Sequence, residues 1–262
     1  MSLDIGSILQ DWLYEPGQIT VRKIRGDDGG EKIQLRLDLG VLQMETTGRP
    51  DGKRPHGRES LLVYYEQKLQ DHKDTHGGDE AFKLDESACE QLRTEAVMYY
   101  HRYLAQFVLE DYVAVERDTS RNLRLLDFFN AYAAEESDRR AMEAYRPYMI
   151  MMNTRARGML ALHDNRARAA LAIVKLGIDR IEDFYKQFGQ EELISKAGET
   201  SVLSAFVKEI ESRIPVDPLT KLKKDLAKAV REERYEDAAH LRDKLRDFSE
   251  DASAEAPDQD KQ

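Results

Sequence analysis

The basic residues with the clearest binding chemistry lie together in one short stretch. Residues 46–58, TTGRPDGKRPHGR, carry Arg49, Lys53, Arg54 and Arg58 against a single acidic residue, Asp51. Glycine lets backbone N–H groups approach an anion closely, and guanidinium groups bind phosphate or carboxylate through paired hydrogen bonds. These four cations are therefore a candidate site for an anion or for a partner. The alternative is a solvated loop whose arginines pair with the many surface carboxylates of an acidic chain.

Two histidines offer the spacing of a metal site. His72 and His76 are four residues apart and can share one face of a helix, and Asp79 is a candidate third ligand. Gly77, Gly78 and the polar residues around them instead favour a flexible linker. We therefore expect no metal ion and no cofactor.

The sequence shows no combination of side chains that resembles a catalytic centre. The lone cysteine, Cys89, has no histidine nearby in the sequence, and adjacent glutamates such as Glu135 and Glu136 point in different directions on a helix. The phosphate-binding pattern G-x-x-x-x-G-K-[ST] does not occur. We expect a protein without enzymatic activity.

The overall composition narrows the classes of partner. A formal net charge of -10 disfavours long-range attraction to nucleic acid, so nucleic acid is not expected as the primary ligand. A single cysteine excludes an intramolecular disulfide and suits a reducing compartment. The first residues lack the basic start of a signal peptide, and no apolar run approaches the ~20 residues that span a bilayer. We expect a cytoplasmic protein that does not enter a membrane.

Alternation of polar and apolar residues near the N-terminus predicts β-structure. A short amphipathic helix is expected over residues 2–14, and turn-forming residues follow at 27–30. After this turn, every second residue is apolar from Ile33 through Leu35 and Leu37 to Leu39. This period of two predicts a β-hairpin with one buried face.

The middle of the chain has the periodicity of helices. Asp85 is a predicted N-cap, Asp118 or Thr119 a second one, and Pro147 should interrupt a helix. Further breaks are predicted around residues 163–165 and at Gly177, Gly189 and Gly198.

The predicted fold is mainly α: a multi-helix body with a small N-terminal β-hairpin and a C-terminal two-helix hairpin. Four regions are expected. Residues 1–78 form the N-terminal α/β-hairpin region with the basic loop, and residues 79–213 form the helical body. Residues 217–248 form the helical hairpin, after a short Pro-rich linker, and residues 249–262 form a disordered acidic tail.

The C-terminal hairpin carries the most specific pattern. Asp217 is a predicted N-cap and Pro218 occupies the first helical position, where proline is favoured. Apolar residues then recur three or four positions apart in each helix, at Leu219, Leu222, Leu226 and Ala229, and at Tyr235, Ala238, Leu241, Leu245 and Phe248. Residues 232–234 mark a tight reversal between them. Helices this short must pack on each other, and the small Ala238 and Ala239 should allow a close approach.

The run from Tyr235 to Leu245, YEDAAHLRDKL, resembles the UVR motif of the excinuclease subunits UvrB and UvrC, which also occurs in the Clp ATPase ClpC and the adaptor McsA. The spacing of Leu222, Leu226 and Ala229 is similar too, whereas the motif typically has Phe in place of Tyr235. The resemblance covers about 30 of the 262 residues. It implies a module for protein–protein interaction rather than a catalytic domain.

The leading hypothesis is a non-enzymatic adaptor of bacterial type. The residues expected to contact the partner are Tyr235, Ala238, Leu241, Arg242, Leu245 and Phe248. The partners implied by the resemblance are UvrA/UvrB-type repair proteins or Clp-type protease components, and a homodimer is also compatible with an open apolar stripe. The alternative is an accessory factor of nucleotide excision repair that contacts DNA through the loop at 46–58.

Overall fold

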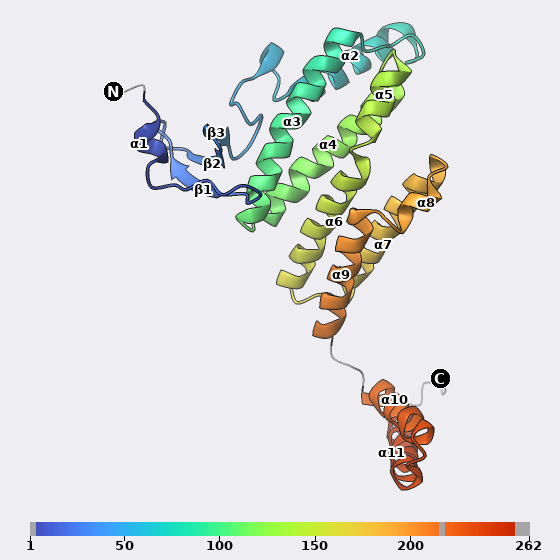
Figure 1. Cartoon of the computed structure of the whole chain (residues 1–262). Helices are drawn as coiled ribbons and strands as arrows, with labels where there is room; N and C mark the ends of the chain where they lie inside the picture. Colours follow the sequence, from blue (N-terminus) through green and yellow to red (C-terminus); the bar gives the residue numbers. More distant parts are fainter. Residues whose placement is uncertain (1–3, 215–217, 255–262) are drawn as a thin grey trace, which may run out of the picture. The chain divides into compact units, whose positions relative to one another are not determined.

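The computed structural model describes residues 4–214 and 218–254. The chain divides into two units, Met1–Glu211 and Ser212–Gln262. The first contains a small sheet and most of the helices, and the second contains a helical hairpin (Figure 1). The predicted mainly α fold is confirmed. The boundary predicted between residues 78 and 79 lies inside the first unit, just after a helix.

The N-terminal β-structure is a three-stranded antiparallel sheet rather than a two-stranded hairpin. Its strands are β1 (Val21–Arg25), β2 (Glu31–Leu37) and β3 (Gly40–Glu45), in the order β1-β2-β3. The predicted run of alternating residues ends at Leu37, which pairs with Gly40, so Leu39 lies in the turn and is exposed. Alternation continued past the strand in the sequence because the turn also contains an apolar residue. The helix predicted over residues 2–14 is shorter in the structure, α1 (Gly6–Leu9).

One face of the sheet packs on the helices. Ile33 pairs with Met44 and Leu35 with Leu42 across β2 and β3. Ile33, Leu35 and Met44 form a buried cluster with Ala105 of α3 (Glu86–Val108). The predicted buried face is therefore present, and it fixes the sheet and the loop that follows β3 against the helical body.

The first three long helices begin at side-chain caps. Helix α2 (Leu61–His76) follows a short 3-10 turn (Pro55–Gly57) and is capped by Ser60, whereas α3 is capped by Asp85 as predicted. Helix α4 (Tyr112–Tyr132) is capped by Asp111, and Asp118 and Thr119 lie inside it. The predicted cap at these two residues is wrong because a tight turn at residues 109–111 already reverses the chain.

The remaining helices of the first unit are α5 (Glu136–Glu143), α6 (Arg146–His163), α7 (Ala167–Gln187), α8 (Glu191–Ile194) and α9 (Gly198–Arg213). Pro147 lies in the first turn of α6, and residues 164–166 separate α6 from α7, as predicted. Gly177 does not break α7. A Cβ atom there would lie 2.4 Å from the side chain of Thr154 on α6, so this glycine allows two helices to pack closely.

The second unit consists of α10 (Pro218–Arg231) and α11 (Tyr235–Ala254), which pack against each other. The predicted two-helix hairpin is confirmed, with Pro218 at its first position. Helix α11 continues past Phe248 to Ala254, into the segment predicted as a disordered tail. Residues 255–262 and the predicted cap Asp217 lie outside the described residues.

Candidate functional site

The reversal between α10 and α11 is a short and well-connected turn. The Arg234 backbone N–H donates to the carbonyl of Ala229 at 2.9 Å, and Glu233 adopts a left-handed backbone conformation with φ of 57°. The Arg234 guanidinium donates to Glu232 at 2.8 Å and to Asp237 at 2.6 Å. These contacts tie the end of α10 to the first turn of α11. The reversal predicted at residues 232–234 is thus present and is held by its own side chains.

Small residues lie at the contact between the two helices. Ala229 is fully buried and Ala238 is 8% exposed, whereas Ala239 is exposed. The leucines of the predicted stripe are half-buried: Leu219, Leu222, Leu226, Leu241 and Leu245. Ala229 and Ala238 therefore allow the close approach, and Ala239 does not contribute to it. The leucine seam keeps part of its apolar surface open to solvent.

Two large apolar side chains at the turn are exposed. Val230 is 52% exposed and Tyr235 is 69% exposed. We call Val230 and Tyr235 the hairpin tip. Tyr235 was expected from the sequence, but Val230 was not. The exposure of Val230 could have been predicted from the sequence. Val230 directly follows Ala229, the last residue of the buried stripe, so on a helix its side chain must face outward.

The other predicted contact residues have different environments. Arg242 is exposed, and Leu241 and Leu245 are half-buried. Ala238 is covered by the facing helix, so it determines how closely the helices approach and cannot touch a partner while the hairpin is closed. The side chain of Phe248 lies outside the described residues.

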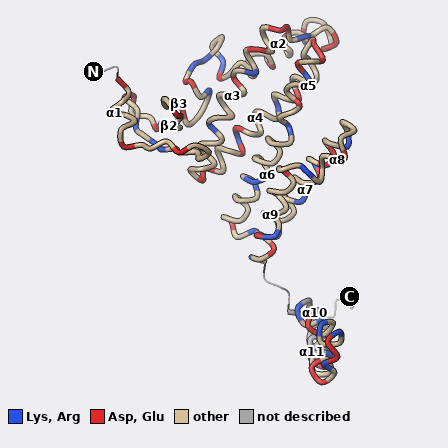
Figure 2. Tube along the Cα trace, viewed as in Figure 1, with Lys and Arg blue, Asp and Glu red and all other residues tan. Residues whose placement is uncertain are grey.

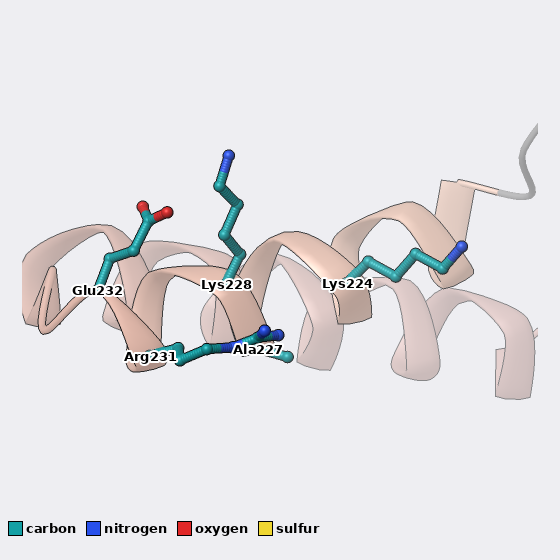
Figure 3. Close-up of a pocket in the computed structure, with 5 residues that line it drawn as sticks. All are labelled: Lys224, Ala227, Lys228, Arg231 and Glu232. Atoms are coloured by element: carbon teal, nitrogen blue, oxygen red, sulfur yellow. The ribbon is translucent and has the colours of Figure 1, made fainter.

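Helix α10 is strongly basic within an acidic protein. It contains five basic residues, Lys221, Lys223, Lys224, Lys228 and Arg231, and one acidic residue, Asp225. Figure 2 shows basic residues in blue and acidic residues in red on the two helices of the hairpin. Figure 3 shows a shallow hollow in which Lys228 and Glu232 project to the same side of the helix and Arg231 to the other. Helix α10 is thus a cationic flank of the hairpin, whereas acidic residues surround the tip itself, namely Glu232, Glu233, Glu236 and Asp237.

In the predicted anion-binding loop, one of the four cations is already paired with carboxylates of the same chain. Arg49 lies 3.2 Å from Asp51 and 3.5 Å from the buried carboxylate of Glu95. Within the described residues, Lys53 and Arg54 form no ion pair and are exposed.

A shallow hollow brings three of the four predicted cations together. Arg49, Lys53 and Arg54 line it, but Arg58 does not. Acidic residues line the same hollow, namely Asp28, Glu45 and Glu59. Their charges oppose those of the cations and reduce the attraction for an anion. Anion binding by this loop stays a prediction.

A buried ionic cluster, which the sequence analysis missed, fixes the loop to the helices. Glu95 has no exposed surface and accepts hydrogen bonds from the guanidinium of Arg121 and from the Leu61 N–H at 2.8 Å. Arg102 binds Asp118 through two hydrogen bonds, of 2.6 and 2.9 Å.

The second half of this cluster reaches the loop itself. Arg102 donates to the carbonyl of Glu45 and Arg117 to that of Thr46, each at 3.0 Å. Burial lowers the pKa of Arg121, and the nearby carboxylate of Glu95 partly offsets this shift. The sequence does contain a sign of this cluster. Glu95 and Arg102 each follow a core residue, Leu92 and Tyr99, by three positions, so they lie on the same buried face of α3. Charged residues at core positions have to find partners inside the protein.

The remaining titratable residues of interest have structural roles. Cys89 is fully buried, and burial raises the pKa of its thiol to about 11. The rings of His72 and His76 stack with centroids 4.2 Å apart, inside α2 rather than in a linker. Asp79 pairs with Lys73 at 2.9 Å and accepts from the Tyr132 hydroxyl, and these contacts lower the pKa of its carboxyl. In the described part of the chain, no group of three His, Cys, Asp or Glu residues could hold a metal ion.

Comparison with known protein families identifies the C-terminal segment. The family model of UVR, described as the UvrB/uvrC motif, matches residues 217–251. No curated protein and no solved structure matches the chain. Among the helices of the described residues, none has the length and apolarity needed to cross a membrane. The segment that forms the helical hairpin is therefore similar to the UvrB/UvrC motif.

Proposed function

We propose that this chain is a non-enzymatic adaptor that binds a protein partner through its C-terminal hairpin. The observation that carries the proposal is the exposure of Val230 and Tyr235 at the tip of a segment that matches the UvrB/UvrC motif. Full burial of a side chain of this size stabilises by roughly 1.5–3 kcal/mol. Exposed aromatic residues are also frequent centres of binding energy in protein interfaces.

The rigidity of the turn supports the same proposal. The backbone bond from Arg234 to Ala229 and the ion pairs of Arg234 with Glu232 and Asp237 favour one conformation of the turn before a partner arrives. A surface ordered in advance loses less conformational entropy on binding. The partly open leucine seam beside the tip, which includes Leu241 and Leu245, extends the apolar surface.

The charge of α10 indicates the kind of partner surface. With five basic residues against one acidic residue, this helix favours an acidic surface next to an apolar pocket. We propose components of UvrA/UvrB-type repair or of Clp-type proteolysis as partners, and the cytoplasm as the setting. A single buried thiol, Cys89, is in keeping with a reducing compartment.

Site-specific photo-crosslinking tests the proposal directly. A photo-reactive benzoylphenylalanine in place of Tyr235 should crosslink a defined protein in the cells that produce the chain. The same residue in place of Val113, which is 66% exposed on α4, is the matched control. A partner captured from both positions alike, or from neither, contradicts binding through the tip.

The alternative function is DNA contact in nucleotide excision repair. It is supported by the exposed cations of the loop at 46–58, of which Lys53, Arg54 and Arg58 form no ion pair within the described residues. It predicts salt-sensitive binding of damaged duplex that is lost when these three residues are replaced by glutamine. Binding that is insensitive to salt, or unchanged in the variant, contradicts it.

A further inference from the structure

A groove lined by aromatic side chains lies between helices α3 and α6. Both helices pack against α4 (Figure 1). The groove has a volume of about 440 Å³. Four tyrosines and two methionines line this space, together with Val97. Small-molecule sites typically have volumes of roughly 300–1,000 Å³ and mostly apolar walls. The groove therefore has the size and the lining of a site for a small ligand.

A polar group without a partner lies at this groove. Tyr103 has no exposed surface, and its hydroxyl finds no hydrogen-bond partner among the described residues. The ring of Tyr100 meets that of Tyr103 edge to face, with centroids 5.5 Å apart, and lies tilted to that of Tyr148 at 6.2 Å. A buried hydroxyl without a partner costs free energy, which a ligand with a hydrogen-bond acceptor can recover.

The groove has little net charge to offer a ligand. Arg93, at its edge, pairs with Asp138 at 3.0 Å. Burial lowers the pKa of His101 and thereby favours the neutral form of its imidazole. Because the other lining side chains are uncharged, the walls favour a neutral molecule over an ion.

We propose that this groove binds an uncharged planar aromatic molecule whose carbonyl oxygen accepts a hydrogen bond from the Tyr103 hydroxyl. The aromatic rings of Tyr145 and Tyr148, which line the groove, provide stacking surfaces for such a ligand. Because Tyr103 has no exposed surface, the proposed binding requires the ring of Tyr100, which contacts that of Tyr103 and is 37% exposed, to turn toward solvent. This site is separate from the hairpin and does not depend on the proposed adaptor function.

The uncharged naphthalene ketone prodan is a suitable probe for the full-length chain. Its emission shifts to the blue in apolar surroundings and to the red when its carbonyl accepts a hydrogen bond. Titration of the wild-type chain should give a saturable blue shift. Val97→Trp, which fills the groove from a position that is 51% exposed, should abolish saturable binding. Val113→Trp is the matched control. If circular dichroism shows that Val97→Trp is misfolded, Val97→Lys serves as the second variant.

Tyr103→Phe tests the hydrogen bond itself. Loss of the hydroxyl should weaken prodan about twofold to tenfold, as expected for one neutral hydrogen bond. The emission of the bound probe should move further to the blue, because its carbonyl loses the donor. No saturable binding to the wild-type chain, or binding that survives both changes at Val97, overturns the site. Unchanged affinity and emission in Tyr103→Phe overturn the proposed class of ligand.

Discussion

Replacement of Glu95 by glutamine should destabilise the first unit strongly. Glu95 is completely buried and is the anionic partner of Arg121 and Arg49, and it also accepts from the Leu61 N–H at the start of α2. Glutamine has nearly the same size, so no cavity forms. Its amide has no charge and leaves the buried Arg121 without an anionic partner. Breaking a buried pair in this way typically costs about 3–5 kcal/mol.

This loss is measurable because a single tryptophan reports on the first unit. Trp12 is the only tryptophan of the chain and lies at the sheet, where the Arg22 guanidinium is 4.0 Å from its ring centroid. Urea unfolding followed by tryptophan fluorescence therefore monitors the first unit without the hairpin. A loss of about 3–5 kcal/mol is a large part of the roughly 5–15 kcal/mol that stabilises a typical domain.

The matched control is Glu136→Gln. Glu136 pairs with Arg140 on the surface of α5, with both side chains largely exposed. Such pairs contribute about 0–1 kcal/mol, so this change should leave the unfolding midpoint almost unaltered. If Glu95→Gln costs less than about 1 kcal/mol, like the control, the buried cluster does not hold the loop and helices together as described.

Three further changes test other parts of the structure. Gly177→Ala should cost about 1–3 kcal/mol, because its methyl group would collide with α6, whereas Gly198→Ala has open space and should be neutral or stabilising in the same urea experiment. Ala238→Glu should lower the helix content measured by circular dichroism, since it places a charge between α10 and α11, and the same change at the exposed Ala239 should not; equal effects would contradict the assigned contact. The Cys89 thiol should react with a disulfide reagent only in urea at neutral pH, because its pKa is raised to about 11, and rapid reaction with the native chain would show that it is accessible. The raised pKa also makes the stability depend on pH. The Cys89 thiol stabilises the native state below its ordinary pKa, and this stabilisation is lost as the pH rises toward about 11. The difference in unfolding free energy between the wild-type chain and Cys89→Ala should therefore change over that range.

The elements that local patterns determine were predicted well. The period of two at Ile33 and Leu35 predicted a strand with a buried face, and Asp85 predicted the start of α3. The hairpin could be predicted because the spacing of its apolar residues, the first-turn Pro218 and the reversal are all local features.

Errors arose where contacts distant in sequence decide the outcome. The low helix propensity of glycine predicts a break at Gly177. In the structure Gly177 lies inside α7, where the nearby side chain of Thr154 on α6 leaves room only for glycine. Asp118 is a good N-cap by type, yet its partner is Arg102 of another helix. Neither relation is visible from sequence spacing alone.

For the same reason, the sequence predicts only in part which residues of the hairpin are exposed. Tyr235 and Arg242 are exposed as a contact surface requires, because the outer face of a short hairpin follows from periodicity. Ala238 was assigned to the partner surface, but it lies against the facing helix of the same chain. Which residues of an apolar stripe are covered depends on how the helices pack, and the stripe itself does not contain that information.

The dissociation constant of the crosslinked partner for the full-length chain measures how much the hairpin tip contributes to binding. The double variant Val230→Ser/Tyr235→Ser removes only exposed apolar side chains and should leave the hairpin folded. We expect this variant to bind at least about tenfold more weakly, equivalent to roughly 1.4 kcal/mol, and Val113→Ser to bind as the wild type does. An affinity within about twofold of the wild-type value would contradict the claim that the hairpin tip binds the partner.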